Sequence, residues 1–271
     1  MFANIKHYSS VAACFARLAI QRQLEYPLFL VTWFLMIPIQ YFGWAWMLKM
    51  LVDHFQPLAG WDFPQLAFIF GLGQLSHGLM IIFFIQTWGI QDWVIHGHFD
   101  RLLLRPLNVF FHFSVSYINF IGAIDLIPGS IIFAYGCRHV GFVWSAANVV
   151  KLVAVILGGM LIRAALYTVT GSIAFWTKRS RALVGLNLAL LERCTLYPLS
   201  IYPYMLQAIL TFLIPIGFIS FYPACGFLGQ DTRSALPLGL AVWTPLIGIA
   251  FMVIAHAVFR AGLRRYESSG S

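Results

Sequence analysis

The sequence has little charge for its length. Of its 271 residues, 10% are charged and 61% are hydrophobic, whereas a soluble domain has about 25% charged residues. This composition excludes an ordinary soluble protein and indicates an integral membrane protein. The formal net charge of +8 does not indicate nucleic-acid binding, because the basic residues lie in short clusters between apolar runs and form no solvated basic face.

Common catalytic motifs are also missing. No GxxxxGK[ST] phosphate-binding loop is present, so the chain is not expected to hydrolyse ATP by the common route. No HExxH motif occurs, and His96 and His98, two residues apart, would not share one helix face. We therefore expect no catalytic residue, metal or cofactor in this chain. The four cysteines form no CxxC pair, and a disulfide between Cys137 and Cys225 remains an alternative to unpaired thiols.

What the sequence does contain is long apolar runs, and these predict an all-α membrane protein. A crossing helix needs about 20 apolar residues. We predict six crossings, at residues 28–51, 65–90, 114–136, 149–176, 182–201 and 237–260. Residues 203–229 contain Pro203, Pro215, Pro223 and Gly217, which favour an outer-face re-entrant helical hairpin over a continuous helix.

Basic residues indicate the orientation in the membrane. Eleven of them share one side only if the number of crossings is even: Lys6, Arg17, Arg22, Arg101, Arg105, Lys178, Arg179, Arg181, Arg260, Arg264 and Arg265. The opposite side has only Lys49, Arg138, Lys151 and Arg233. Because cytoplasmic loops carry the excess of Lys and Arg, we place both termini in the cytoplasm. Tryptophans mark the predicted interfaces, with Trp44, Trp46, Trp61 and Trp144 outside and Trp88, Trp93 and Trp176 inside.

The two ends of the chain are expected to be cytoplasmic segments, residues 1–27 and 261–271, flanking a transmembrane domain at 28–260. Apolar residues such as Ile5, Tyr8 and Ala12 recur at helical spacing, which predicts an amphipathic helix along the bilayer surface over 4–26. The alternative is a frayed start of the first crossing. Pro27 favours a break between the surface helix at 4–26 and the first crossing at 28–51. No cleavable signal peptide is expected, because polar and mixed residues precede the first apolar run.

Three ionisable residues are predicted at mid-bilayer depth. Asp125, Arg163 and Glu192 each lie on the order of 15–21 Å from the cytoplasmic side, at 1.5 Å rise per residue. Such residues are costly in a membrane and often functional. We predict that Arg163 pairs with Asp125, Glu192 or both, either as a structural ion pair or in the transport pathway. His77 is interpreted as a structural histidine, with a proton relay as the alternative.

A polar segment interrupts the apolar runs at residues 97–106, within a cytoplasmic loop at 91–113. Its sequence is GHFDRLLLRP, in which three leucines stand between charged residues. Adjacent leucines are poorly suited to open water, so the segment indicates a contact site for a soluble partner. Leu102, Leu103 and Leu104 would form the apolar knob, Asp100 and Arg105 its charged rim, and Pro106 would end the helix.

This segment resembles the cytoplasmic loop of the six-span ABC-2-type exporter permeases, which reads approximately G-E-L-D-R-L-L-L-R-P-x-N-P. The matching residues are Gly97, Asp100, Arg101, Leu102, Leu103, Leu104, Arg105, Pro106 and Asn108, while His98, Phe99 and Val109 depart. Further similarities are Ala174-Phe175-Trp176, YPLSIYP at 197–203, LTFLIP at 210–215, Tyr222-Pro223-Ala224 and Arg264-Arg265-Tyr266. The resemblance runs through nearly the whole chain.

The resemblance implies a plasma-membrane (inner-membrane) permease that dimerises with a second copy or a paralogous permease. It also implies two cytoplasmic ATPase subunits, which bind ATP and Mg²⁺ and contact residues 97–106. The re-entrant hairpin of the family would contain Pro203, Pro215, Tyr222 and Pro223. The implied function is export, in contact with membrane lipids and without nucleic acid. The aromatic content of 17% and the scarcity of buried charge fit a hydrophobic or amphipathic substrate, cationic ones included.

Two other functions remain as alternatives from the residues alone. A membrane enzyme acting on lipids would need clustered His, Asp or Glu, whereas the outer loops have scattered Asp53, His54, Asp62, His139 and Asp231. A self-standing secondary transporter would show two similar halves with interrupted helices, and the sequence shows one interrupted region. The transported substrate cannot be read from the sequence.

Overall fold

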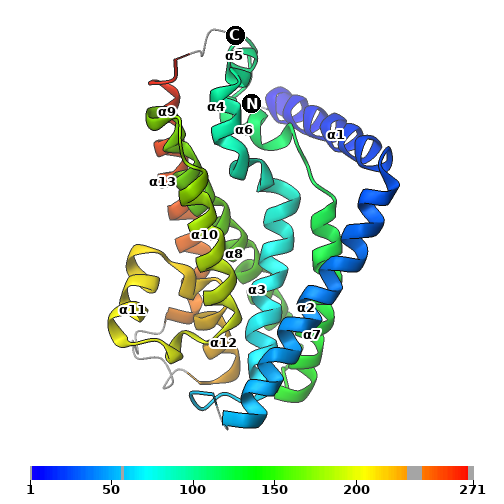
Figure 1. The fold of residues 1–271 in the computed structure, drawn as a ribbon, viewed down its shortest axis with the longest axis vertical. Coiled ribbons are helices and arrows are strands. Elements are labelled where there is room, and N and C mark those ends of the chain that lie inside the picture. Colours follow the sequence, from blue (N-terminus) through cyan, green and yellow to red (C-terminus); the bar gives the residue numbers. More distant parts are fainter. Residues whose placement is uncertain (1, 56–57, 231–239, 268–271) are drawn as a thin grey trace.

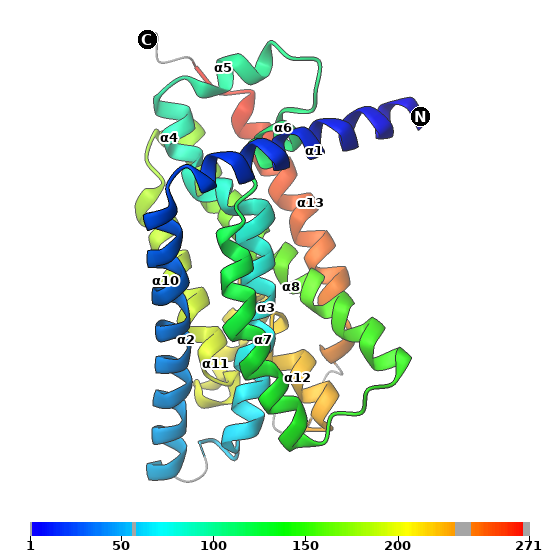
Figure 2. The same ribbon diagram turned by 90° about the vertical axis from the view of Figure 1, so that its right-hand side faces the viewer.

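The computed structural model describes residues 2–55, 58–230 and 240–267. It is a bundle of helices along one long axis, with α1 (Phe2–Leu24) crossing one end at a steep angle to the others (Figures 1 and 2). No β-strand occurs among the described residues. The prediction of an all-α fold is therefore confirmed.

Five of the described helical segments are long and apolar enough to cross a membrane. They are α2 (Pro27–Phe55), the run from α3 (Phe63–Phe84) through η1 (Ile85–Gly89) to α4 (Ile90–Ile95), α7 (Ile121–Val140), α8 (Ala146–Ser172) with α9 (Ala174–Thr177), and α13 (Thr244–Leu263). They coincide with five of the six predicted crossings. The predicted third crossing begins seven residues late, because Asn108 caps a separate helix, α6 (Val109–Val115), by accepting a bond from the Phe111 amide.

The predicted crossing at 182–201 corresponds to α10 (Arg181–Leu196), which has 16 residues. At 1.5 Å per residue it is about 24 Å long, shorter than the roughly 30 Å hydrocarbon core of a bilayer. It ends where Tyr197 becomes extended, because the following Pro198 disfavours helical backbone in the residue before it. The sixth crossing thus stays a prediction.

Glycine contacts bring the central helices close together. A Cβ added to Gly122 of α7 would lie 2.5 Å from the Gly78 carbonyl oxygen of α3, and one added to Gly248 of α13 would lie 2.6 Å from the Gly158 carbonyl oxygen of α8. Small residues allow such backbone contacts between membrane helices. The two close pairs are α3 with α7 and α8 with α13, and α3 and α8 are the most buried of the long helices.

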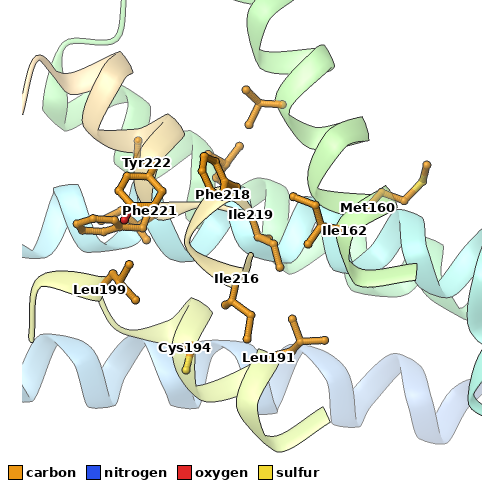
Figure 3. Packing of buried hydrophobic residues seen from close by; sticks show 14 of the residues in the cluster. Met160, Ile162, Leu191, Cys194, Leu199, Ile216, Phe218, Ile219, Phe221 and Tyr222 are labelled. Atoms are coloured by element: carbon orange, nitrogen blue, oxygen red, sulfur yellow. The ribbon is translucent and has the colours of Figure 1, made fainter. Parts of the chain in front are cut away.

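The predicted hairpin at 203–229 is a chain of short helical pieces in the half of the bundle away from α5 (Figure 1). They are α11 (Tyr204–Ala208), the π-turn η3 (Ile209–Leu213), η4 (Ile216–Phe218) and α12 (Phe221–Leu228), preceded by η2 (Leu199–Ile201) and followed by η6 (Leu240–Val242). Figure 3 shows Ile216, Phe218 and Tyr222 packed in one apolar cluster with Ile162 of α8 and Leu191 of α10.

The N-terminal helix is anchored to the start of α7. Gln23 donates through Nε2 to Asn119 Oδ1 at 3.0 Å and accepts from the Phe120 amide at 3.2 Å. The Arg22 guanidinium lies 5.0 Å from the centre of the Tyr117 ring. The side chains of residues 1–9 and 12, which carry much of the predicted amphipathic pattern, lie outside the described residues, as do Asp231, Arg233 and the last four residues of the predicted tail.

Two expectations about single side chains are settled by the packing. Trp61, predicted at the outer interface, does not face lipid, because it is fully buried and its Nε1 donates to Ser200 Oγ at 3.0 Å. Trp46 and Trp144, in contrast, are exposed. None of the four cysteines is in a disulfide, so Cys137 and Cys225 are not bonded to each other.

Candidate functional site

The polar segment at 97–106 forms a short helix at one end of the bundle, beside α1 and the C-terminal end of α13 (Figures 1 and 2). Gly97 adopts a left-handed backbone (φ 67°) between α4 and α5 (His98–Leu103), a conformation that glycine takes without strain. The helix ends at Leu103, two residues before Arg105-Pro106. The sharp turn at Gly97 lets α5 pack back on the bundle.

One face of α5 is buried in an aromatic cluster. Phe99 is fully buried, and its ring centre lies 5.5 Å from that of Phe113 in α6, 5.2 Å from Phe175 in α9 and 5.8 Å from Phe259 in α13. Leu102 belongs to the same cluster and is 6% exposed. This cluster packs α5 against three other helices, α6, α9 and α13.

The predicted three-leucine knob is therefore wrong in one residue. Leu102 points into the protein, whereas Leu103 is 49% exposed and Leu104 is 87% exposed. Arg101, Arg105 and Pro106 are also exposed, and Gly97 and Asp100 are partly buried. Residues on a helix repeat every 3.6 positions, so three consecutive leucines cannot all face one way. The apolar surface offered to a partner consists of Leu103 and Leu104.

A polar contact joins this region to the start of α10. The Gln91 side-chain oxygen accepts bonds from the Ser180 and Arg181 amides, and the Arg181 guanidinium pairs with the Asp92 carboxylate at 2.8 Å. Amides at a helix N-terminus have no partner within their own helix, and Gln91 supplies one. The segment before α5 is thus connected to α10 as well as to the aromatic cluster.

A histidine lies beneath the end of the polar segment. His112 of α6 is buried, its Nε2 lies 3.3 Å from Arg105 Nη1, and its ring centre lies 5.5 Å from that of Phe15 in α1. Burial, and then the nearby Arg105 guanidinium, lower the pKa of His112 below its ordinary value of 6.5. The neutral imidazole is therefore favoured at neutral pH.

Deeper in the bundle, the three predicted ionisable residues line one cavity of about 480 Å³ between α2, α3, α7, α8 and α10. The Tyr41 hydroxyl of α2 donates to Asp125 Oδ1 at 2.8 Å. Glu192 is partly buried on another wall of the cavity. The prediction that Asp125, Arg163 and Glu192 lie at a common depth agrees with this arrangement.

The predicted ion pairing of Arg163 is wrong. Its guanidinium donates through Nε to Ser76 Oγ at 3.3 Å, and through Nη2 to the Gly73 carbonyl at 3.3 Å and to Thr195 Oγ1 at 3.2 Å. Among the described residues no carboxylate lies within 4.0 Å of the Arg163 guanidinium. Because Arg163 projects between α3 and α10, neutral oxygens of those two helices lie within hydrogen-bond distance of its guanidinium.

The remaining walls of the cavity are largely aromatic. They include Phe29, Trp33, Trp44, Trp88 and Tyr117. His77 also lines it, and among the described residues neither His77 Nδ1 nor Trp88 Nε1 has a hydrogen-bond partner. The interpretation of His77 as a hydrogen-bonded structural residue is thus unsupported at Nδ1. Trp44 and Trp88 line the cavity, which their prediction as interface residues did not anticipate.

The predicted hairpin residues lie where the short helices between 203 and 229 begin. Pro203 precedes α11, Pro215 precedes η4, and Pro223 lies in the first turn of α12, where its missing amide hydrogen costs no bond. The Tyr222 and Thr211 hydroxyls are 2.6 Å apart, and the Thr244 hydroxyl donates to the Phe218 carbonyl at 2.8 Å. These hydroxyls supply partners where the helix is broken.

Sequence reasoning missed Tyr41, Ser76 and Thr195, which hold the charged residues of the cavity. Tyr41 stands inside a long apolar run, and a buried tyrosine hydroxyl usually has a partner, so its position was a usable signal. Ser76 and Thr195 gave none, because short hydroxyl residues are common in membrane helices. Within the described ranges no group of three or more His, Cys, Asp or Glu side chains is arranged to bind a metal.

Comparison with known proteins agrees with this geometry. Neither curated proteins nor solved structures gave a match. A family model described as an ABC-2 family transporter protein matches residues 25–270, which include all the helices from α2 to α13, the 97–106 segment and the cavity. The chain therefore belongs to the ABC-2 family of transporter proteins.

Proposed function

We propose that this chain is the permease subunit of an ATP-binding-cassette exporter, driven by separate cytoplasmic ATPase subunits that bind ATP and Mg²⁺. The substrate would be hydrophobic or amphipathic and would leave the cytoplasm or the inner leaflet. The observation that carries the proposal is the pair Leu103 and Leu104, two exposed apolar side chains at the C-terminal end of α5, whose other face is buried. Membership of a transporter family favours this function over a lipid-modifying enzyme.

The packing of α5 suits transmission of force. An ATPase that engages Leu103 and Leu104 would push on a helix joined by Phe99 to α6, α9 and α13, and through Gln91 and Asp92 to α10. ATP binding can bias the membrane domain only through contacts that differ between its states. A rigid attachment to four helices lets one contact shift several of them together.

The proposed topology has six crossings, with α10 as the fifth and both termini in the cytoplasm of the plasma membrane. It is supported by the position of α1, α5 and the end of α13 at one end of the bundle (Figure 2). These elements contain or adjoin most of the basic residues. The steep angle of α1 to α2 favours a helix lying along the bilayer surface. The burial of α12 favours a re-entrant hairpin shielded from lipid.

A second permease, either another copy or a paralogue, would complete the transporter. α2 is the least buried of the long helices, since only 11% of the residues in its most apolar stretch are buried. Its large exposed apolar surface fits lipid together with a second permease.

Co-purification and ATP hydrolysis test the proposal. Leu104→Asp should reduce capture of the cognate ATPase, or coupling of its hydrolysis to export, by about tenfold or more, because a charge replaces an apolar contact. The control is Val143→Asp, since Val143 is also an exposed apolar residue but lies between α7 and α8 at the other end of the bundle. Full coupling in a Leu103→Asp, Leu104→Asp double variant would refute the assignment.

A further inference from the structure

We propose that the cavity between α2, α3, α7 and α10 binds an organic cation, whose charged group lies near Asp125 and Glu192 and whose apolar body contacts the aromatic walls. This inference rests on the proposed function, because it names the chemical class of the exported substrate. It comes from the charges and rings that line the cavity.

The charge balance of the cavity favours a cation. Two carboxylates, Asp125 and Glu192, face one guanidinium, that of Arg163. Arg163 is 2% exposed and already donates to Ser76, Gly73 and Thr195. With both carboxylates ionised, the lining carries a net charge of minus one. Charges away from bulk water are screened weakly, so a monovalent cation is the complementary ligand.

Asp125 has capacity for such a ligand. A carboxylate offers about four lone-pair sites, and the described contacts use one of them, for the Tyr41 hydroxyl. That bond also orients the carboxylate toward α2. No lysine lines the cavity, and Arg163 is its sole arginine among the described residues. The remaining acceptor sites of Asp125 and those of Glu192 are therefore available to a bound ammonium or a similar group.

The aromatic walls favour an organic ligand over a metal ion. The rings of Trp33, Trp44, Trp88 and Tyr117 line the same space as the two carboxylates, and tryptophan faces attract cations most strongly. Within the described ranges, no three His, Cys, Asp or Glu side chains lie together as ligands for a metal ion. The volume of about 480 Å³ falls within the roughly 300–1,000 Å³ typical of small-molecule sites.

Tetraphenylphosphonium and tetraphenylborate test the sign of the preferred charge, because they have the same shape and opposite charge. Binding is measured by isothermal titration on the full-length chain in nanodiscs of zwitterionic lipid, with empty nanodiscs subtracted. We expect saturable binding of the phosphonium and at least about tenfold weaker binding of the borate, a factor that corresponds to about 1.4 kcal/mol. Equal binding of both ions, or no saturable binding of the phosphonium, would overturn the proposal.

Variants locate the site. Asp125→Asn and Glu192→Gln should each weaken phosphonium binding by about tenfold, whereas Asp53→Asn, the same change at an exposed carboxylate outside the cavity, should leave it unchanged. Trp33→Leu should weaken both ions, because it removes a ring without changing charge. Should Asp125→Asn fail to fold, Glu192→Gln carries the test. Unchanged binding in a folded Glu192→Gln variant would place the cation elsewhere and refute the site.

The two proposals fail separately. Leu104→Asp should bind the phosphonium normally and lose coupling to the ATPase, whereas Glu192→Gln should retain the ATPase and lose the cation. If the wild-type chain does not bind the phosphonium but ATP hydrolysis still drives export, the substrate class alone is refuted. Cation binding without any captured ATPase would refute the exporter proposal alone.

Discussion

Replacing Phe99 with alanine should release α5 from the bundle while the membrane helices stay folded. The ring is fully buried, and five aromatic rings have their centres within 6 Å of it, from Trp93, Phe113, Phe175, Phe259 and Tyr266. Truncation of a buried phenylalanine costs about 3–5 kcal/mol. A helix of six residues has almost no stability of its own, so the loss falls mainly on the opening of α5.

The magnitude can be read by hydrogen exchange of the amides in residues 97–103. A loss of about 3 kcal/mol in local opening free energy corresponds to about a hundredfold faster exchange. Leu103→Ala is the matched control, because its side chain is 49% exposed and truncation should change exchange less than about fivefold. Amides of α3 and α7 should be unaffected in both variants.

Coupling to ATP hydrolysis provides the second measurement. In Phe99→Ala, the ATPase should still bind through Leu103 and Leu104 but should drive little transport, because α5 no longer moves with α6, α9 and α13. If α5 in this variant exchanges as slowly as in wild type, the aromatic cluster does not hold the helix, and the proposed transmission of force is wrong.

Three other changes test the packing and the charges around the site. Gly122→Ala should lower the melting temperature strongly, because the added methyl group would lie 2.5 Å from the Gly78 carbonyl oxygen, whereas Gly43→Ala, with no atom within 4 Å of the added Cβ, should not; equal melting of the two variants would contradict the close approach of α3 and α7. The pKa of His112 is lowered in the folded chain, so as pH falls through about 6.5 the unfolded chain binds a proton at His112 before the folded chain does. The free energy of unfolding therefore decreases below that pH. His112→Phe should lessen the decline in melting temperature between pH 7.5 and 5.5. Asp92→Asn removes an exposed ion pair with Arg181 and should cost less than about 1 kcal/mol in chemical denaturation; a loss of several kcal/mol would show that the pair holds α4 to α10.

The sequence was sufficient for the class of protein and for the place of the polar segment at 97–106. Apolar runs reveal membrane helices because each span must be continuous and apolar to satisfy lipid. The polar residues at 97–106 were conspicuous for the same reason. The length of α10 was less predictable, because the apolar character of 182–201 continues past the helix end that Pro198 imposes.

Details of the two candidate sites depended on contacts between distant residues. Three consecutive leucines are equivalent in the sequence, and the aromatic cluster around Phe99 decides that Leu102 is buried while Leu103 and Leu104 face outward. Trp61 and Trp144 both lie near the end of an apolar run and look alike in the sequence. Trp61 is nevertheless buried, and its side chain bonds to Ser200, 139 residues away.

The sequence by itself thus determined that this is a helical membrane protein of a transporter family with a polar segment at 97–106, since hydropathy and local motifs are properties of neighbouring residues. Only the tertiary structure decided how the buried charges are satisfied. A guanidinium bonds to whichever acceptors its helix neighbours bring within about 3 Å, and for Arg163 these are Ser76, Gly73 and Thr195. That choice leaves Asp125 and Glu192 facing an aromatic cavity.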